Sequence, residues 1–220
     1  MPTFKYLGVP LSLKEMAFQA IKNAILSKKL VPGKVYNERG LAKELGISKT
    51  PVREALLDLA SKGFITFLPR RGVQINALTE KDIKDLYEVR IALETAILRH
   101  ITPKLSKAEL RKIEIIYQKE KGAIKGDDRL GYMRIDRGFH LYLARLTDNR
   151  YMITSLENIR DLIDWMVFKA LTRSQRMEEV KREHERVIER LKERDTPGAI
   201  RMMEEHIRIT EQNVLQWFKT

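Results

Sequence analysis

Residues 37–61 contain two short helical patterns separated by a very tight turn. The first, residues 38–45, follows Asn37 and stops at Gly46, and the second begins after Ser48. Asn and Ser both favour the N-cap position, and Pro51 lies in the first turn of the second helix, where its missing N–H breaks no hydrogen bond. Two short helices joined by three or four residues that include glycine predict a helix-turn-helix.

Elements on either side of this motif complete a compact unit. Ser12 and Glu15 form a capping box that opens a preceding helix, and we expect that helix to end at residues 31–33. After the motif, β-branched and aromatic residues at 64–68 and 73–75 flank a Pro/Gly turn that carries two arginines, which predicts a hairpin. An arginine turn alone is more often a solvated hairpin end. Directly after a helix-turn-helix it is expected to be a wing that contacts DNA.

The net charge of +12 is unevenly distributed along the 220 residues. Residues 1–77 contain 13 Lys and Arg against 5 Asp and Glu, a net charge of +8, whereas the longer remainder carries only +4. Positive charge concentrated around a helix-turn-helix is typical of a module that binds the phosphates of DNA. We therefore predict that residues 1–76 form a winged helix-turn-helix domain whose partner is double-stranded operator DNA.

The second helix of the motif carries the side chains expected to read DNA. Its first turns contain four polar or basic residues, Ser48, Lys49, Thr50 and Arg53, while its opposite face is apolar. The guanidinium fork of Arg53 matches the O6 and N7 acceptors of guanine. Ser48 and Thr50 are better placed for phosphate, near the positive end of the helix. The alternative for Arg53 is a surface ion pair with Glu44 or Glu54.

The run NERGLAKELGISKTPVREAL at residues 37–56, followed by LASKGFI at residues 59–65, resembles the winged helix-turn-helix of the GntR superfamily of bacterial transcription regulators. The resemblance implies a DNA-binding set composed of Arg39, Ser48, Lys49, Thr50, Arg53 and, at the wing tip, Arg71 and Gly72. Lys49 differs from the arginine common at its position.

From Thr79 to the C-terminus the apolar residues repeat with helical spacing and no strand pattern recurs. A capping box at Ser106 and Glu109 opens one helix, and Thr196 is the expected cap of the last, with Pro197 in its first turn. We expect six helices, at residues 79–100, 106–125, 128–146, 150–171, 175–194 and 197–218. The fold class is therefore mainly α, with an all-helical domain at residues 79–220 behind the winged head.

Three of the four histidines lie on apolar faces of three different helices. His140 follows Asp136 by four residues, which puts both on one face, and His184 and His206 lie in later apolar stripes. A single inward histidine is usually a core residue, but three beside a carboxylate that is costly to bury unpaired favour a divalent cation. Because the chain has no cysteine, only nitrogen and oxygen ligands are available, which suits Zn²⁺ or Ni²⁺.

Arg90 lies in the middle of the apolar stripe of the first helix of this domain. One interpretation is an internal ion pair with Glu94 or Asp136. The other is that Arg90 and the metal together bind an organic acid, because a guanidinium fork matches a carboxylate. The second interpretation makes Arg90 an effector-binding residue.

The helical region resembles the ligand-binding domain of the FCD branch of the same superfamily. The matching stretches are residues 90–94, 136–140, 183–184 with Asp195 and Ala199 downstream, and 206–207. The resemblance implies a bundle of six or seven helices and small carboxylic acids as effectors. It also implies a metal held by Asp136, His140, His184 and His206.

These observations predict a homodimeric regulator of transcription whose operator affinity is changed by a small carboxylic acid bound near a divalent metal. Two alternatives remain, an enzyme in which the metal activates water and a metal with a purely structural role. Neither a separate general base nor a His-Glu-x-x-His motif is evident, and the basic head has no role in an enzyme, so we expect no catalytic activity.

The sequence also indicates where such a protein works. No apolar run is long enough for a membrane helix, and the first ten residues lack the apolar core of a signal peptide. The absence of cysteine gives no sign of a secreted disulfide framework. We therefore expect a cytoplasmic protein with no membrane partner.

Overall fold

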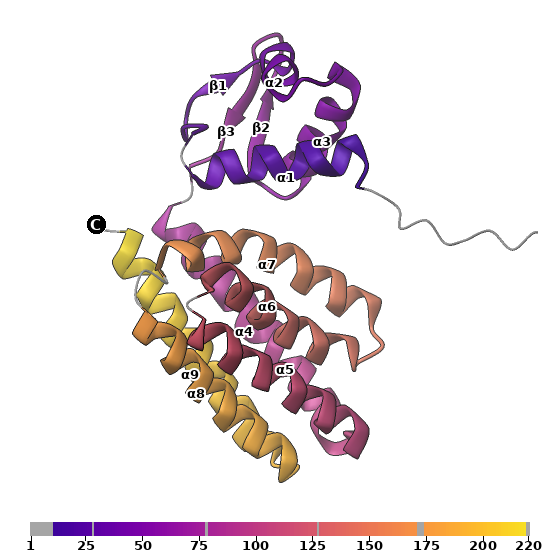
Figure 1. The fold of residues 1–220 in the computed structure, drawn as a ribbon, viewed down its shortest axis with the longest axis vertical. Coiled ribbons are helices and arrows are strands. Elements are labelled where there is room, and N and C mark those ends of the chain that lie inside the picture. The colour runs from indigo at the N-terminus through magenta and orange to yellow at the C-terminus, as the bar shows by residue number, and fades with distance from the viewer. Residues whose placement is uncertain (1–10, 28, 78, 127, 171–173, 219–220) are drawn as a thin grey trace, which may run out of the picture. The chain divides into compact units, whose positions relative to one another are not determined.

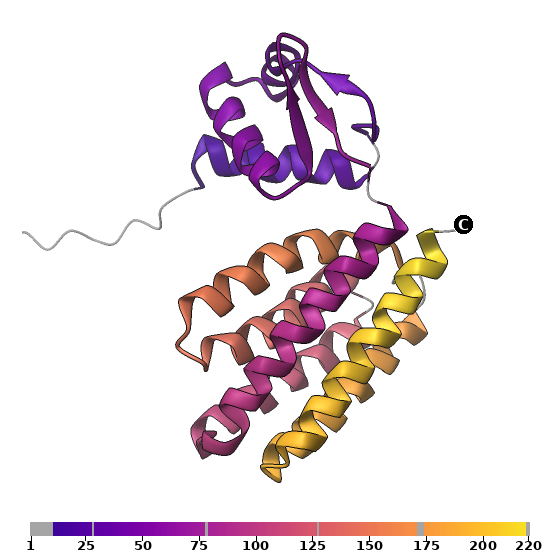
Figure 2. The ribbon, with the colours of Figure 1, turned by 180° about the vertical axis from the view of Figure 1, so that it is seen from behind.

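The computed structural model describes residues 11–27, 29–77, 79–126, 128–170 and 174–218. The chain divides into two compact units, Met1–Ala77 and Leu78–Thr220, which Figures 1 and 2 show from opposite sides. Residues 1–10, for which we predicted no signal peptide, lie outside the described residues, and so does the predicted helix end at residue 171.

The described part of the first unit combines three helices with a small antiparallel sheet (Figure 1). Its elements are α1 (Leu13–Leu26), β1 (Val35–Tyr36), α2 (Glu38–Leu45), α3 (Lys49–Ser61), β2 (Ile65–Leu68) and β3 (Gly72–Ile75). The strand order is β1-β3-β2, with Val35 opposite Gln74 and Phe67 opposite Val73. The predicted hairpin is β2 and β3. The sequence analysis missed β1, because two residues are too few to show an alternating pattern.

Local capping explains where these helices begin and end. Ser12 and Glu15 form the predicted capping box of α1, and the Asn37 side chain accepts a hydrogen bond from the Gly40 amide at 2.6 Å. Gly46 ends α2 in the left-handed conformation, with φ of 67°. Ser48 is the N-cap residue of α3, as expected, although its side chain makes no capping hydrogen bond. The expected end of α1 was wrong, because α1 ends at Leu26, several residues before 31–33.

Gly72 is required by the packing of the sheet. Its φ of +121° is a conformation that residues with a Cβ rarely adopt, and a Cβ there would lie 2.2 Å from the carbonyl oxygen of Tyr36. The close approach of β1 to β3 therefore gives this glycine a structural role, whether or not it also touches DNA.

The second unit is a bundle of six α-helices and one short 3-10 helix within the described residues (Figure 2). Its elements are α4 (Glu80–Ile101), η1 (Thr102–Lys104), α5 (Lys107–Lys125), α6 (Arg129–Arg145), α7 (Arg150–Ala170), α8 (Ser174–Lys192) and α9 (Thr196–Phe218). Every α-helix begins and ends within two residues of the prediction. The fold class, a winged helix-turn-helix followed by an all-helical bundle, is confirmed.

The start of α9 differs from the expectation. The Asp195 carboxylate accepts the Gly198 amide at 2.9 Å, so Asp195 is the capping side chain and Thr196 is already helical. Aspartate and threonine are both good N-cap residues, and the sequence alone does not decide between two adjacent ones.

The helices of the second unit surround a main apolar core and a second, smaller apolar cluster of Tyr132, Met177 and Val180. α4 packs against α6, α7 and α9, α5 packs against α6 and α8, and α8 packs against α9. Tyr87, Ile97, Leu156, Val187 and Met203 are among the fully buried side chains of the main core. None of the described helices is long and apolar enough to cross a membrane. What distinguishes this core is the set of charged and imidazole side chains at its centre.

Candidate metal centre and nucleic-acid interface

The four residues predicted to bind a metal lie together inside the bundle. α6 provides Asp136 and His140, α8 provides His184, and α9 provides His206. One ligand atom from each lies within 4.8 Å of all the others. The Asp136 Oδ1 atom is 3.9 Å from Nε2 of His140 and 3.7 Å from Nε2 of His184. All three imidazoles are buried.

Each imidazole is oriented by a glutamate on its Nδ1 side. The pairs are His140 with Glu94, His184 with Glu120 at 2.9 Å, and His206 with Glu183 at 2.7 Å. A carboxylate that accepts the Nδ1–H leaves the Nε2 lone pair free to act as a ligand, which is the usual arrangement around protein-bound metals. The Nε2 atoms of His184 and His206 are buried without a hydrogen-bond partner. Buried nitrogens of this kind call for a partner such as a cation.

Two buried arginines contact the centre. Arg160 binds Asp136 and lies 3.1 Å from Asp164. Arg90 donates from Nε to Glu94 at 2.6 Å, and its second contact is to Nε2 of His140 at 3.1 Å. The internal pairing of Arg90 with Glu94 is therefore present, whereas Asp136, the other partner considered for Arg90, pairs with Arg160.

The electrostatic surroundings favour the metal-binding protonation states of Asp136 and His206, but they favour the protonated form of His184. Burial raises the pKa of Asp136, but Arg160 and the facing imidazoles outweigh it and hold that pKa far below its usual value. Burial lowers the pKa of His206 to about 4, despite the opposing effect of Glu183. For His184, the carboxylates of Glu120 and Asp136 outweigh burial and raise the pKa. At neutral pH, Asp136 is a carboxylate and His206 is a neutral imidazole.

A small cavity lies beside these ligands. Arg90, Asp136, Arg160, His206 and Thr210 line it together with apolar residues. Its volume is about 10 Å³, enough for one water-sized particle. An organic acid would have to widen this space in order to bind there.

The sequence analysis did not assign four charged residues of this centre to the site. They are Glu120, Arg160, Arg176 and Glu183. Glu120 and Arg160 each interrupt an apolar stripe at helical spacing, as Arg160 does between the buried Leu156 and Ile163. This is the same signal that singled out Arg90, so it could have found these two, whereas Arg176 and Glu183 have polar neighbours at helical spacing. It does not reveal which residues pair across helices.

Most residues predicted to bind DNA surround a groove of about 430 Å³ on the first unit. Five basic side chains line it, Arg39 from α2, Lys49 and Arg53 from α3, and Arg70 and Arg71 from the turn between β2 and β3. Gly72 also borders the groove. Ser48 and Thr50 are exposed at the start of α3 but do not line it.

Arg53 has an internal partner that the sequence analysis did not consider. Its guanidinium lies 3.0 Å from Glu38 of α2, and Lys49 lies 3.5 Å from the same carboxylate. The alternative considered for Arg53, a surface ion pair, is therefore present, but its partner is Glu38 and not Glu44 or Glu54. The Arg53 side chain remains 55% exposed, so it is accessible to DNA.

A winged helix-turn-helix with a basic groove, followed by a separate helical domain with a buried Asp/His₃ cluster, defines a DNA-binding regulator of two domains. The chain belongs to the gntR family of bacterial regulatory proteins, which it matches over residues 13–75, and it carries an FCD domain at residues 85–209. It is a transcriptional regulator of this family.

Individual relatives agree with this assignment. The chain is 31% identical to an HTH-type transcriptional regulator, YdhC, of Bacillus subtilis (strain 168), over 83% of this chain and 82% of the relative. McbR/YncC of E. coli shares the fold, with a TM-score of 0.76 and 20% identity over 96% of this chain and 99% of that one. The metal-free FCD domain of TM0439 matches with a TM-score of 0.56 and 27% identity, over 66% of this chain and 99% of that domain.

Proposed function

We propose that this regulator binds a divalent metal, Zn²⁺ or Ni²⁺, at Asp136, His140, His184 and His206, and that a small carboxylic acid bound beside the metal changes the affinity for operator DNA. One observation carries the proposal. Three buried imidazoles, each held by a glutamate at Nδ1, face one aspartate oxygen, and two of their Nε2 atoms have no partner. A core histidine without a ligand role needs no such common target.

The donor set fits a divalent ion. Three neutral imidazoles and one carboxylate are ligands that both Zn²⁺ and Ni²⁺ accept, and the glutamates provide the outer hydrogen bonds that such sites use. When bound, the ion supplies a Lewis-acidic position for a carboxylate oxygen. To act as a ligand through Nε2, His140 would have to give up the present contact of that nitrogen with Arg90.

Arg90 is the proposed effector-binding residue. It lines the cavity beside Asp136 and His206, and the contact to His140 brings one of its guanidinium nitrogens to the metal-binding edge of the imidazole. If one carboxylate oxygen of the acid binds the metal, the Arg90 guanidinium is suited to bind the other oxygen. Because the cavity holds only a water-sized particle, binding of an acid is coupled to rearrangement of the surrounding helices.

The DNA-binding half of the proposal assigns contacts to Arg39, Ser48, Lys49, Thr50, Arg53, Arg71 and Gly72. Residues 1–76 are the DNA-binding domain and residues 79–220 the sensor domain. A homodimer places two α3 helices on the half-sites of a pseudo-palindromic operator in the cytoplasm. The basic groove supports this assignment, because it brings α2, α3 and the wing tip to one surface.

The decisive experiment measures metal content and thermal unfolding, with His184→Ala compared with His100→Ala. His100 is the exposed fourth histidine and serves as the control. We expect about one divalent ion per chain in the unaltered protein and in H100A, and none in H184A. Free metal at 100 times its Kd should stabilise the fold by about 2.7 kcal/mol. Equal metal content in the two variants would contradict the proposal.

A structural metal is the second candidate, and the small volume of the cavity favours it. Adding a panel of small carboxylic acids to the metal-loaded protein distinguishes an effector-binding metal site from a structural one. The proposed effector role predicts that one acid raises the melting temperature and shifts operator affinity, and that Arg90→Gln abolishes both effects. If no acid changes either quantity while chelation still lowers the melting temperature, the metal is structural.

A further inference from the structure

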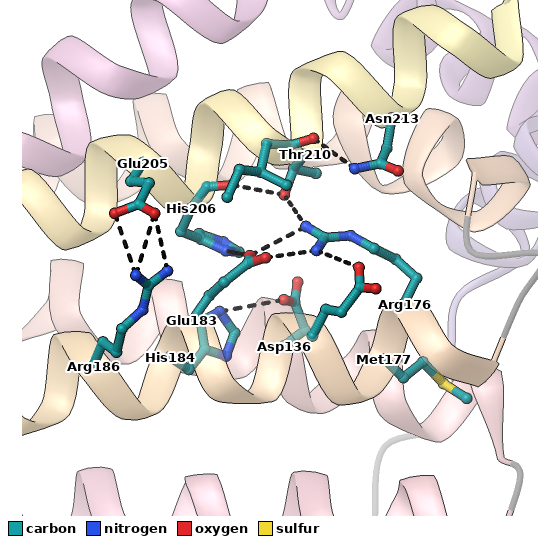
Figure 3. Close-up of polar contacts among 12 residues, drawn as sticks. Asp136, Arg176, Met177, Glu183, His184, Arg186, Glu205, His206, Thr210 and Asn213 are labelled. Atoms are coloured by element: carbon teal, nitrogen blue, oxygen red, sulfur yellow. Dashed lines mark hydrogen bonds and ion pairs between the residues drawn. The ribbon is translucent and has the colours of Figure 1, made fainter.

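Arg176, at the start of α8, is the hub of a buried network beside the metal centre (Figure 3). Its guanidinium donates to both oxygens of Glu183, at 2.6 Å and 3.1 Å, and to Oγ1 of Thr210 at 3.3 Å. It also reaches Glu179 at 3.2 Å. The Arg176 side chain is only 8% exposed. A two-point contact of this kind holds a carboxylate in one orientation.

Glu183 is the glutamate that holds His206. Its Oε2 atom accepts the Nδ1–H of His206 at 2.7 Å and lies 3.1 Å from Arg176. Arg176 and His206 therefore donate to the same carboxylate, and the guanidinium reaches both of its oxygens. A glutamate alone has three rotatable side-chain bonds, whereas one clamped by a guanidinium has a fixed direction.

We propose that Arg176 is a positioning residue of the metal centre, which clamps Glu183 and through it aims Nε2 of His206 at the metal. The inference rests on the proposed metal site. It gives Arg176 a role in orienting a metal ligand, in addition to linking α8 to α9. Loss of a hydrogen bond behind a metal ligand commonly weakens metal binding about 10- to 100-fold.

The molecule contains a matched control on the same two helices. Arg186 of α8 pairs with Glu205 of α9 at 3.2 Å, and Figure 3 shows this pair beside the Arg176 network. Both of its side chains are more than 40% exposed. Glu205 directly precedes His206 in the sequence, so Arg186→Gln reports on any effect of an α8–α9 ion pair on the backbone next to the ligand.

The test is a Co²⁺ titration of metal-stripped, full-length protein against a competing chelator, together with the visible absorption of bound Co²⁺. Arg176→Gln should weaken Co²⁺ binding ~10-fold and change the absorption bands, because the ligand field at His206 changes. Arg186→Gln should leave both unchanged. Arg176→Lys, which keeps the charge but loses the two-point geometry, should fall between R176Q and the unaltered protein.

The results distinguish the possible failures. Unaltered affinity and absorption in R176Q would overturn the positioning role and leave Arg176 as a link between two helices. Equal weakening in R176Q and R186Q would overturn it as well. If R176Q does not fold, R176K decides, and Co²⁺ binding in R176K identical to the unaltered protein would count against the inference. No Co²⁺ binding by the unaltered protein would overturn the metal site itself, and this inference with it.

Discussion

Charge is used in opposite ways in the two units of this chain. In the groove of the first unit the basic side chains are exposed, and Arg53 and Lys49 share one carboxylate, Glu38, that DNA can replace. In the second unit Arg90 and Arg160 are almost completely buried and paired with specific carboxylates. Exposed pairs contribute little to stability and exchange partners readily, whereas buried pairs fix geometry and are costly to break. The first unit therefore presents charges that a partner can reach, and the second encloses charges that hold its helices together.

The largest expected effect comes from breaking a buried pair. Arg160→Gln removes the guanidinium that pairs with the buried Asp136 carboxylate. We expect the free energy of unfolding to fall by about 3–5 kcal/mol. Denaturant unfolding in the presence of a chelator measures this loss without a contribution from metal. Arg145→Gln is the control, because Arg145 is exposed and its pair with Glu157 is worth at most about 1 kcal/mol. If the free energy of unfolding fell equally in R160Q and R145Q, buried and exposed ion pairs would not differ in their contribution to stability, and the comparison between the units would fail.

An intermediate effect is expected at the DNA surface. Arg53→Gln should weaken binding to an operator selected in vitro from random DNA by about 1–3 kcal/mol and relax the preference at one base pair. Stability should change by less than about 0.5 kcal/mol, because the side chain is exposed. Lys43→Gln, on α2 outside the groove, should bind normally. Fluorescence anisotropy with single-base operator variants measures both affinity and preference, and a uniform loss over all sequences would assign Arg53 to phosphate instead.

The smallest effect is expected at the wing, and it distinguishes phosphate contacts from base contacts within the groove. Arg71→Gln at the wing should reduce operator affinity equally for all sequences, because a wing arginine is expected to contact the backbone. The slope of log affinity against log salt concentration should become shallower by about one. An unchanged slope would show that Arg71 contacts no phosphate.

The two units also differ in how much their sequences reveal. Helix boundaries in the second unit were predictable within two residues, since capping boxes such as Ser106 with Glu109 and the helical spacing of apolar residues are local signals. The inward positions of Asp136 and the three histidines follow from the same spacing. Which glutamate faces which imidazole was not predictable, because each pair joins two helices and depends on how they pack. The Glu38 partner of Arg53 was missed for the same reason.

The hydrogen bonds around the candidate metal centre involve all six described α-helices of the second unit and join them in two groups of three. Glu94 of α4 and Arg160 of α7 form hydrogen bonds with residues of α6. Glu120 of α5 forms one with α8, and Glu183 of α8 forms one with α9. These contacts span 23 to 64 residues of sequence. Helices form early from local contacts, while contacts of long sequence separation come later in folding. The candidate centre is therefore expected to be among the last parts of the domain to assemble, because His206 joins the other three residues only after α9, the last helix, has docked.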